Sequence, residues 1–559
     1  MVDSPELKAR SEEVASLLER MKQLNAVGIA LSSCRNTSFL LEEILTAARK
    51  ITDADAGTLY LLEQKHLKFE ILQNDSLNIY KGGAHNDPIP FAPIPLYQAD
   101  GAPNDSLIVV YSAIHDRTVN VQDAYQDGDF DFSGPRKFDE MTGYRSRSFL
   151  AVPMKNHEQD IIGVLQLINA CDPKTGVVGS FSADDQQLVE SLASQAAVAL
   201  TNQALIQQLE QLFESFVRMI NAAIDDKSPY TAGHCARVPV LTLMLADAVS
   251  AQQQGPYADF TMSAVDRNEL HIAALLHDCG KVTTPVHIVD KATKLESIND
   301  RIQLLDTRFE IIRRDLEIAQ LRAQLLAASA QEGAEEAKAA QGQYQSTLEQ
   351  LRSDQIFLHQ CNTGGEYMAP ELKQRVKDIS QRYQWKNGQG EILPILTDNE
   401  IYNLCIERGT LTAEEREIIN RHVVMTINML NSIQWPKHLQ RVAEYAGGHH
   451  ERMDGKGYPK GLKRAQMSVQ ARVMAIADIF EALTARDRPY KPGKKLSEAL
   501  DILGKMNLGQ HVDPDLFDIF IREKVYLRYA QEYMHPEQLD AVDESKIPGY
   551  VPEATTVAH

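Results

Sequence analysis

The stretch His277-Asp278-Cys279-Gly280-Lys281 ends an apolar segment and decides how this chain is interpreted. A second stretch lies far downstream, His449-His450-Glu451-Arg452-Met453-Asp454-Gly455-Lys456-Gly457-Tyr458-Pro459. A histidine next to an aspartate, with two further adjacent histidines, supplies enough ligands for more than one metal ion. The lysine after the first pair and the glycine-rich turn after the second suggest a phosphate-bearing substrate. Together the two stretches predict a metal-dependent phosphodiesterase.

Length and charge limit what the whole chain can be. With 559 residues the chain is too long for one core, so two or three domains are expected. The net charge of −20 repels polyanions and argues against binding to a nucleic-acid polymer. The polar start and the lack of an apolar run of about 20 residues predict neither a signal peptide nor membrane insertion. Six scattered cysteines predict reduced thiols in a cytoplasmic protein.

The N-terminal part has the pattern of a small α+β domain. After a helical start, strand-like runs occur at 58–62, 66–72, 148–154 and 161–168. The segments 51–62, 121–125, 138–148 and 163–170 resemble a GAF domain over residues 22–204, closest to those of cyclic-nucleotide phosphodiesterases. The resemblance implies a central antiparallel sheet flanked by helices. Such a domain binds a small ligand, for which a cyclic nucleotide is one option, or acts only as a dimerisation or signalling module.

A long helix is expected from Ser182, a plausible N-cap, to Asp226. Within it an apolar seam alternates four- and three-residue steps, through Leu205, Leu209, Leu212, Phe216, Met219 and Ala223. This heptad pattern predicts a parallel helix pair that links sensor to effector in a homodimer. The alternative is a helix that lies on its own domain.

A second seam runs from Leu295 to Leu326, and a helical pattern resumes at Leu348 after a stretch rich in Ala, Glu and Gly. The two segments predict an antiparallel helical hairpin with its turn near Gly333. The hairpin is part of an insertion over residues 293–397, because it separates His277-Asp278 from the next candidate ligand. Dimerisation, partner docking and substrate gating all remain open as its role.

Five histidines and two aspartates form the candidate metal site: His234, His277, Asp278, His422, His449, His450 and Asp478. An aspartate can bridge two cations with its two oxygens, while neutral imidazoles fill other positions. Such a mixed donor set suits Fe or Mn better than Mg.

This set resembles the HD phosphohydrolases. The segments around His422, His449-His450, Asp454-Gly455, Gly457-Tyr458-Pro459 and Asp487–Lys491 resemble their HD-GYP branch, over about residues 212–292 and 398–522. The resemblance implies an all-α domain that acts as a cyclic-di-GMP phosphodiesterase with two divalent metal ions.

The resemblance also implies roles for single residues. One metal takes His234, His277, Asp278 and Asp478, and the other takes Asp278, His422, His449 and His450. Lys281 is expected to hold a phosphate oxygen, Arg488 and Lys491 are further phosphate contacts, and Gly457-Tyr458-Pro459 shapes the substrate side or meets protein partners.

Some relatives carry a glutamate four residues before the first histidine, which helps bind a third metal. Tyr230 stands there in this chain, so a dinuclear site is predicted.

The expected organisation is an N-terminal helix (1–21), a GAF domain (22–204), a linking helix (205–226), an HD-GYP domain (212–522) interrupted by 293–397, and a C-terminal tail (523–559). The expected reaction converts cyclic-di-GMP to pGpG and onward to GMP. One alternative substrate is 3′,3′-cyclic GMP-AMP. Another alternative is a non-catalytic protein that binds nucleotide or docks to diguanylate cyclases, and a generic mononucleotide hydrolase fits the His-Asp pair but not the Gly-Tyr-Pro segment.

Overall fold

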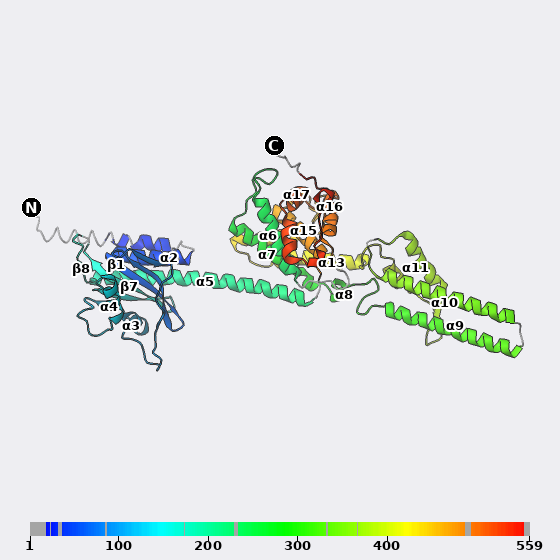
Figure 1. Cartoon of the computed structure of the whole chain (residues 1–559), viewed down its shortest axis with the longest axis horizontal. Coiled ribbons are helices and arrows are strands. Elements are labelled where there is room, and N and C mark those ends of the chain that lie inside the picture. Colours follow the sequence, from blue (N-terminus) through cyan, green and yellow to red (C-terminus); the bar gives the residue numbers. More distant parts are fainter. Residues whose placement is uncertain are drawn as a thin grey trace, which may run out of the picture. The chain divides into compact units, whose positions relative to one another are not determined.

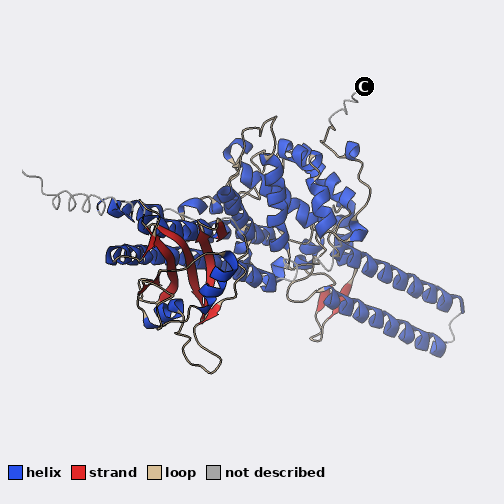
Figure 2. Ribbon diagram, turned by 60° about the vertical axis from the view of Figure 1, so that its left-hand side comes forward, coloured by secondary structure: helices blue, strands red, loops and turns tan. Residues whose placement is uncertain are grey.

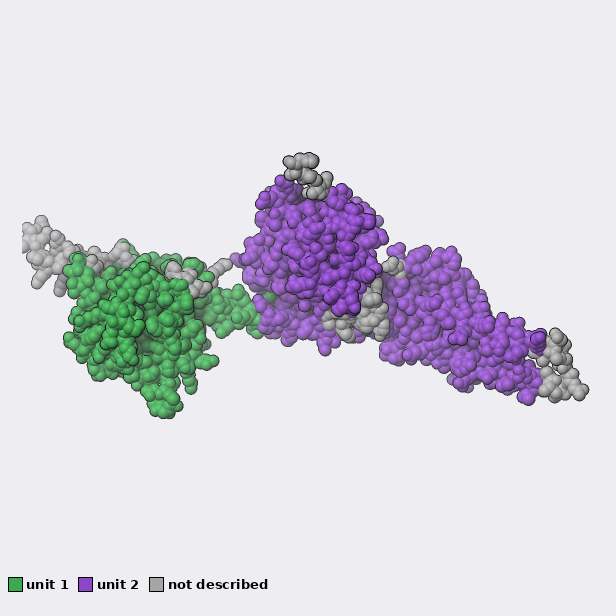
Figure 3. All heavy atoms as spheres, in the orientation of Figure 1, with its two compact units in different colours: residues 1–213 green, residues 214–559 purple. Residues whose placement is uncertain are grey.

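The computed structural model describes residues 18, 20–22, 24–31, 36–83, 87–172, 174–227, 233–330, 334–365, 367–486 and 493–552. The chain divides into two compact units, residues 1–213 and 214–559 (Figure 3). Among the described residues, no helix combines the length and the apolar character needed to cross a membrane. The five cysteines within the described ranges are all free thiols, as the sequence predicts.

The first unit is built on an antiparallel sheet with the strand order β3-β2-β1-β7-β6-β5 (Figures 1 and 2). Its main strands are β1 (Ala54–Glu63), β2 (His66–Asn74), β3 (Ile79–Gly82), β5 (Val119–Val121), β6 (Phe149–Lys155) and β7 (Ile161–Cys171). The two-residue strands β4 (Ile94–Pro95) and β8 (Val178–Gly179) pair with β2 and β7. The strands β1 and β7 lie at the centre, so the side chains of both are largely buried.

Each face of this sheet has its own apolar core. The helix α2 (Thr37–Thr52) and the first turns of α5 (Ala183–Lys227) pack on one face, where Ile44 and Ala196 meet Leu165 of β7. The helices α3 (Ile108–His115) and α4 (Ser133–Thr142) lie on the other side, where Val110 of α3 and Phe149 of β6 share a second core. The predicted α+β domain with an antiparallel sheet and flanking helices is confirmed.

The helix α5 spans 45 residues and carries an exposed apolar seam. At its start the Ser182 hydroxyl accepts a hydrogen bond from the Asp185 amide at 3.1 Å, which is the predicted N-cap contact. Five seam residues, Leu205, Leu209, Leu212, Phe216 and Met219, each have at least half of their surface exposed. The seam therefore does not pack on the domain that carries it.

The second unit is a helical domain with an inserted arm (Figure 1). Its helices outside the insertion are α6 (His234–Ser250), α7 (Ala264–Leu276), α8 (Val286–Val289), α12 (Asp398–Leu404), α13 (Ala413–Asn431), α14 (Val442–Gly447), α15 (Val469–Thr484), α16 (Leu496–Leu508), α17 (Pro514–Arg522) and α18 (Val525–Tyr533). Short 3₁₀ turns include η2 (Cys279–Thr283). The predicted all-α class is confirmed for the domain outside the insertion.

The insertion contains the predicted hairpin, formed by α9 (Ile302–Ala330) and α10 (Ala334–Asn362), which run side by side in Figures 1 and 2. The expected turn residue Gly333 lies outside the described residues. The base of the hairpin packs with α11 (Pro370–Arg382) into a separate core that includes Leu305, Phe309 and Ile379. At its root, the backbone of Thr293 pairs with that of Thr363, so the two ends of the hairpin meet.

Two details of the insertion differ from the sequence expectation. The seam residue Ile298 precedes α9 and is 88% exposed, because the helix begins only at Ile302. A short antiparallel pair, β9 (Gln384–Lys386) and β10 (Ile392–Pro394), follows α11 and was not predicted. Each strand has only three residues, which is too short to give a readable alternation of apolar and polar residues.

Candidate metal centre

Five separate elements bring the seven predicted ligands together. His234 is the first residue of α6, His277 is the C-cap of α7 and Asp278 follows it directly. His422 lies on α13 and Asp478 lies on α15. His449 and His450 follow the end of α14. The groups come from positions up to 244 residues apart, so only the folded domain can assemble them.

Local signals in the sequence fix where these elements begin. The helix α7 starts with a capping box of Ser263 and Asp266, and α13 starts with one of Thr412 and Glu415. These caps satisfy backbone amides that a helix start leaves without partners. They thereby fix the residue at which each helix begins. His277 and His422 are therefore delivered at defined positions along their helices.

Gly280 allows the turn that carries His277 and Asp278 to approach α13 closely. A Cβ atom on Gly280 would lie 2.0 Å from the His422 carbonyl oxygen and 2.6 Å from the Thr426 amide nitrogen. The Gly280 amide instead donates a hydrogen bond to the Thr426 hydroxyl at 2.9 Å, and that hydroxyl donates to the His277 carbonyl at 3.1 Å. Thr426 thus joins the turn of Asp278 to the helix of His422.

Asp278 lies between two groups of histidines. Its Oδ2 atom is 3.5 Å from Nε2 of His234 and 3.4 Å from Nε2 of His277. Its Oδ1 atom is 3.2 Å from Nε2 of His422. Asp478 Oδ1 lies 3.2 Å from Nε2 of His234 and closes the first group. The two oxygens of one carboxylate therefore face two different sets of ligands.

The donor atoms fit cations that would fill the space between them. In each of three sets of residues, the potential ligand atoms lie within 4.8 Å of one another. The sets are His234-His277-Asp478, His422-His449-His450 and His277-Asp278-His449. Within the described part of the chain, four of these atoms are buried without a hydrogen-bond partner: Nε2 of His277, His422 and His449, and Oδ1 of Asp278. Buried polar atoms without partners are costly, and a bound cation would satisfy all four.

In three of the buried histidines, a hydrogen bond from Nδ1 to the backbone leaves Nε2 facing the centre. Nδ1 of His277 donates to the Ala274 carbonyl at 2.6 Å, and Nδ1 of His422 and His449 donate in the same way to Ile419 and Ala446 at 2.5 Å. These bonds place the proton on Nδ1 and leave Nε2 as a lone-pair donor toward the centre.

His234 has a different support, which the sequence interpretation missed. Its Nδ1 atom donates to the carboxylate of Glu481, which is fully buried on α15 one turn after Asp478. Arg237 Nε donates to the other oxygen of Glu481 at 2.6 Å. Asp478 and Glu481 have i, i+3 spacing, which is the one sequence signal that could have pointed to this pair.

The protonation states of His449 and His450 favour metal binding. Burial lowers the pKa of His449 well below its ordinary value, and burial lowers that of His450 to about 4. Both imidazoles are therefore neutral near pH 7, which is the form that binds metals. Burial alone would lower the pKa of Lys281, but the neighbouring Asp278 carboxylate raises it, so Lys281 stays charged.

The predicted substrate side forms one edge of the centre. Lys281 Nζ is 2.5 Å from Asp278 Oδ2, and its side chain is partly exposed. The ring of Tyr458 stacks on His450 with centroids 4.8 Å apart. Glu451, which the sequence interpretation did not single out, is buried and accepts hydrogen bonds from the amides of Lys460 and Leu462 at 2.7 and 2.8 Å. Glu451 thus fixes the loop that contains Gly457, Tyr458 and Pro459.

Three predicted positions cannot be placed. Arg488 and Lys491, expected to contact phosphate, lie outside the described residues, as does Tyr230, on which the prediction of two metals depends. The roles of these residues remain predictions.

Comparison with known families agrees with this arrangement. A family model described as "GAF domain" matches residues 37–200. Two models described as "HD domain" match residues 231–356 and 395–516. The resemblances inferred from the motifs are therefore confirmed at the level of these two domain families.

Curated relatives are similar over about a fifth of the chain. One from Thermotoga maritima, named cyclic di-GMP phosphodiesterase, is 37% identical over 119 residues, or 21% of this chain and 32% of its own. One from Vibrio cholerae, named 3′3′-cGAMP-specific phosphodiesterase 1, is 37% identical over 114 residues, or 20% of this chain and 26% of its own. A cyclic di-GMP phosphodiesterase from Pseudomonas aeruginosa is 38% identical over 114 residues, with the same shares. The chain thus spans at most a third of each relative's length.

Proposed function

We propose that this chain, which contains a GAF domain followed by an HD domain, hydrolyses a 3′,5′-phosphodiester bond of a cyclic dinucleotide at a centre of two divalent metal ions. The preferred substrate in this proposal is cyclic-di-GMP, with pGpG as the product and GMP as a further product. The observation that carries the proposal is the position of Asp278, whose two carboxylate oxygens face separate histidine groups.

The two groups of candidate ligands support two separate metal positions. His234, His277 and Asp478 would hold one ion, and His422, His449 and His450 would hold the other, with Asp278 shared between them. The mixed nitrogen and oxygen donors favour Fe or Mn. When bound, such ions lower the pKa of water and polarise phosphoryl oxygens.

The chain's own residues would bind and orient the phosphate. Lys281 carries a positive charge at the edge of the centre, where it would stabilise charge that develops on a phosphoryl oxygen. Arg488 and Lys491 would add further phosphate contacts. Tyr458, held against His450, presents an aromatic surface next to the ligands, and Gly457 and Pro459 shape the same loop.

A single substitution tests whether the centre works as proposed. We expect Asp278→Ala to abolish metal binding and hydrolysis together, because it removes the ligand shared by both groups. Asp259→Ala, an exposed aspartate of the same unit, is the matched control and should retain both properties. Turnover by the Asp278→Ala protein at the parent rate would refute the assignment.

Two neighbouring proposals are separated by product analysis. Incubating the metal-loaded protein with cyclic-di-GMP and with 3′,3′-cyclic GMP-AMP, followed by chromatography, would show which one is cleaved faster. The second substrate has specific support, because a similar Vibrio cholerae protein is named for it. Tight binding of either nucleotide without products would instead favour a non-catalytic receptor or a protein that docks to diguanylate cyclases.

The domain order supports regulation by the N-terminal unit. We propose that a ligand of the GAF domain changes the register or splay of α5 in a homodimer and thereby changes activity in the second unit. Deleting residues 1–200 should alter the rate of hydrolysis. An unchanged rate, with and without candidate ligands, would exclude this regulation.

A further inference from the structure

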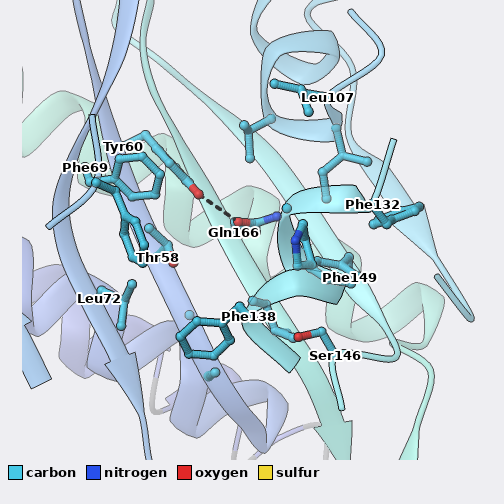
Figure 4. Close-up of a pocket in the computed structure, with 18 of the residues that line it drawn as sticks. Thr58, Tyr60, Phe69, Leu72, Leu107, Phe132, Phe138, Ser146, Phe149 and Gln166 are labelled. Atoms are coloured by element: carbon cyan, nitrogen blue, oxygen red, sulfur yellow. Dashed lines mark hydrogen bonds between the residues drawn. The ribbon is translucent and has the colours of Figure 1, made fainter. Parts of the chain in front are cut away.

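The first unit contains a cavity of about 370 Å³ between its sheet and the helices α3 and α4 (Figure 4). This volume lies in the range of pockets that hold small organic ligands. The cavity belongs to the GAF domain and shares no residue with the metal centre. Its ligand is therefore a question separate from the proposed hydrolysis.

Aromatic rings form two opposite walls of this cavity. Tyr60 and Phe69 lie on one side with ring centroids 4.7 Å apart, and Phe91 extends that side at 5.3 Å from Phe69. Phe132 and Phe149 lie on the other side, 5.2 Å apart (Figure 4). Walls of this kind favour a flat ring system that stacks or makes edge contacts on both sides.

A neutral polar pair lies between the walls. The Tyr60 hydroxyl donates to Gln166 Oε1 at 3.0 Å, and both side chains are buried. Burial raises the pKa of Tyr60, so the phenol stays neutral. The amide group of Gln166 makes no other hydrogen bond within the described part of the chain, so its Nε2 can donate to a ligand. A ligand atom that accepts a hydrogen bond would satisfy it.

The charges around the cavity disfavour an anion. Among the described lining residues, Asp131 is the one charged side chain, and none is basic. Asp131 also accepts a hydrogen bond from the Ser133 amide at 2.8 Å, so its negative charge already occupies the start of α4. The start of α3 also borders the cavity through Ile108 and Val109, but a helix terminus offsets only part of the cost of burying an unpaired charge.

From these features we infer that the cavity binds an uncharged, planar aromatic molecule with a hydrogen-bond acceptor in its ring, in preference to a cyclic nucleotide. The aromatic walls supply the contact area, Gln166 supplies the donor, and the described lining offers no basic side chain to pair with an anion.

Phenazine, which is flat, neutral and carries ring nitrogens that accept hydrogen bonds, is a suitable probe. Its affinity for the full chain would be measured by calorimetry beside phenazine-1-carboxylate, cyclic GMP and cyclic AMP. We expect one phenazine per chain and at least tenfold weaker binding of the carboxylate. Gln166→Leu should weaken phenazine binding by about three- to tenfold, as expected for the loss of one hydrogen bond. Leu72→Trp, which fills the cavity with a larger ring, should abolish it even if the first variant folds poorly.

A charge variant tests the selectivity separately. Asp131→Asn should strengthen binding of phenazine-1-carboxylate and leave that of phenazine unchanged. Asp129→Asn, an exposed neighbour that does not line the cavity, is the matched control and should change neither. The inference is overturned if cyclic GMP or cyclic AMP binds more tightly than phenazine in a Leu72→Trp-sensitive manner. It is also overturned if phenazine fails to bind up to its solubility, or if folded Leu72→Trp protein binds it normally.

Discussion

Glu481 supports the candidate ligand His234 without belonging to the candidate ligand set. It accepts the Nδ1 proton of His234 and is itself held by Arg237. We expect Glu481→Gln to lower metal affinity about 10- to 100-fold, because partners behind a ligand fix its tautomer and orientation. Metal titration by calorimetry, together with metal content after dialysis, would measure the loss. Glu498→Gln, on the exposed face of α16, should bind metal like the parent protein. Equal affinities for all three proteins would contradict the role.

Gly280 controls the distance between the His277-Asp278 turn and α13. We expect Gly280→Ala to destabilise the fold by several kcal/mol and to weaken metal binding, because the added methyl group meets backbone atoms of His422 and Thr426. Thermal unfolding would report the change. Gly342→Ala is the control: Gly342 lies within α10 with open space around it, so alanine should stabilise by about 0.5–1 kcal/mol. Similar unfolding temperatures for the two variants would refute the steric explanation.

The sequence pointed to the candidate ligands but not to the residues that support them. His277-Asp278 and His449-His450 are adjacent pairs within a recognisable motif set, so the seven candidate ligands that the structure brings together could be named. Glu481 and Glu451 were not singled out, although Glu481 stands three residues after Asp478 and Glu451 follows His450, because spacing alone does not show what a glutamate carboxylate contacts. Their function depends on which side chains the fold brings beside them, and that information is tertiary.

At the scale of elements, the insertion depends on one buried carboxylate. Asp354 of α10 is fully buried and accepts hydrogen bonds from Arg382 at 2.6 Å and from Arg375 and Tyr383 at 3.1 Å. We expect Asp354→Asn to destabilise this arm by roughly 3 kcal/mol, because it leaves buried donors with a weaker, uncharged partner. Hydrogen exchange of α10 and α11 would locate the effect. Asp378→Asn, exposed on α11, should exchange like the parent.

The same contact has a defined pH dependence. Burial raises the pKa of Asp354, but hydrogen bonds from Gln350, Arg375 and Tyr383 and the charge of Arg382 lower it overall. A carboxyl with a lowered pKa in the folded state contributes stability above its unfolded pKa of about 4, and this stability is lost as pH falls through the folded value. The difference between parent and Asp354→Asn should therefore be full near pH 7 and should shrink in acid below pH 4. A difference that grows in acid would contradict this sign.

Helices were predicted more reliably than short strands. The predicted cap Ser182 marks a helix start that the structure reproduces, since α5 begins at Ala183, because a cap is a local interaction between near neighbours. The predicted seam begins too early, at Leu295, because the helical spacing of apolar residues includes Leu295 and Ile298, which both precede α9. Periodicity alone cannot distinguish a packed helical residue from an apolar residue in the preceding loop.

At the scale of the whole molecule, the exposed seam of α5 predicts self-association. Apolar residues at heptad spacing that remain exposed in one chain are typical of a coiled-coil interface. We expect the parent to sediment as a dimer, and Leu209→Glu with Leu212→Glu to shift it toward monomer. Gln208→Glu, an exposed residue beside the seam, adds one charge to the same helix and should leave the dimer intact. A monomeric parent protein would exclude this interface.

The backbone pairing of Thr293 with Thr363 has a practical consequence for protein engineering. Since the chain enters and leaves the hairpin at neighbouring points, the end of the hairpin far from Thr293 and Thr363 can be shortened or replaced while its base, which packs with α11, is kept. A tight turn, or a foreign domain whose termini lie close together, could be spliced there in its place. The insertion is thus a suitable site for a fluorescent reporter or a synthetic control module.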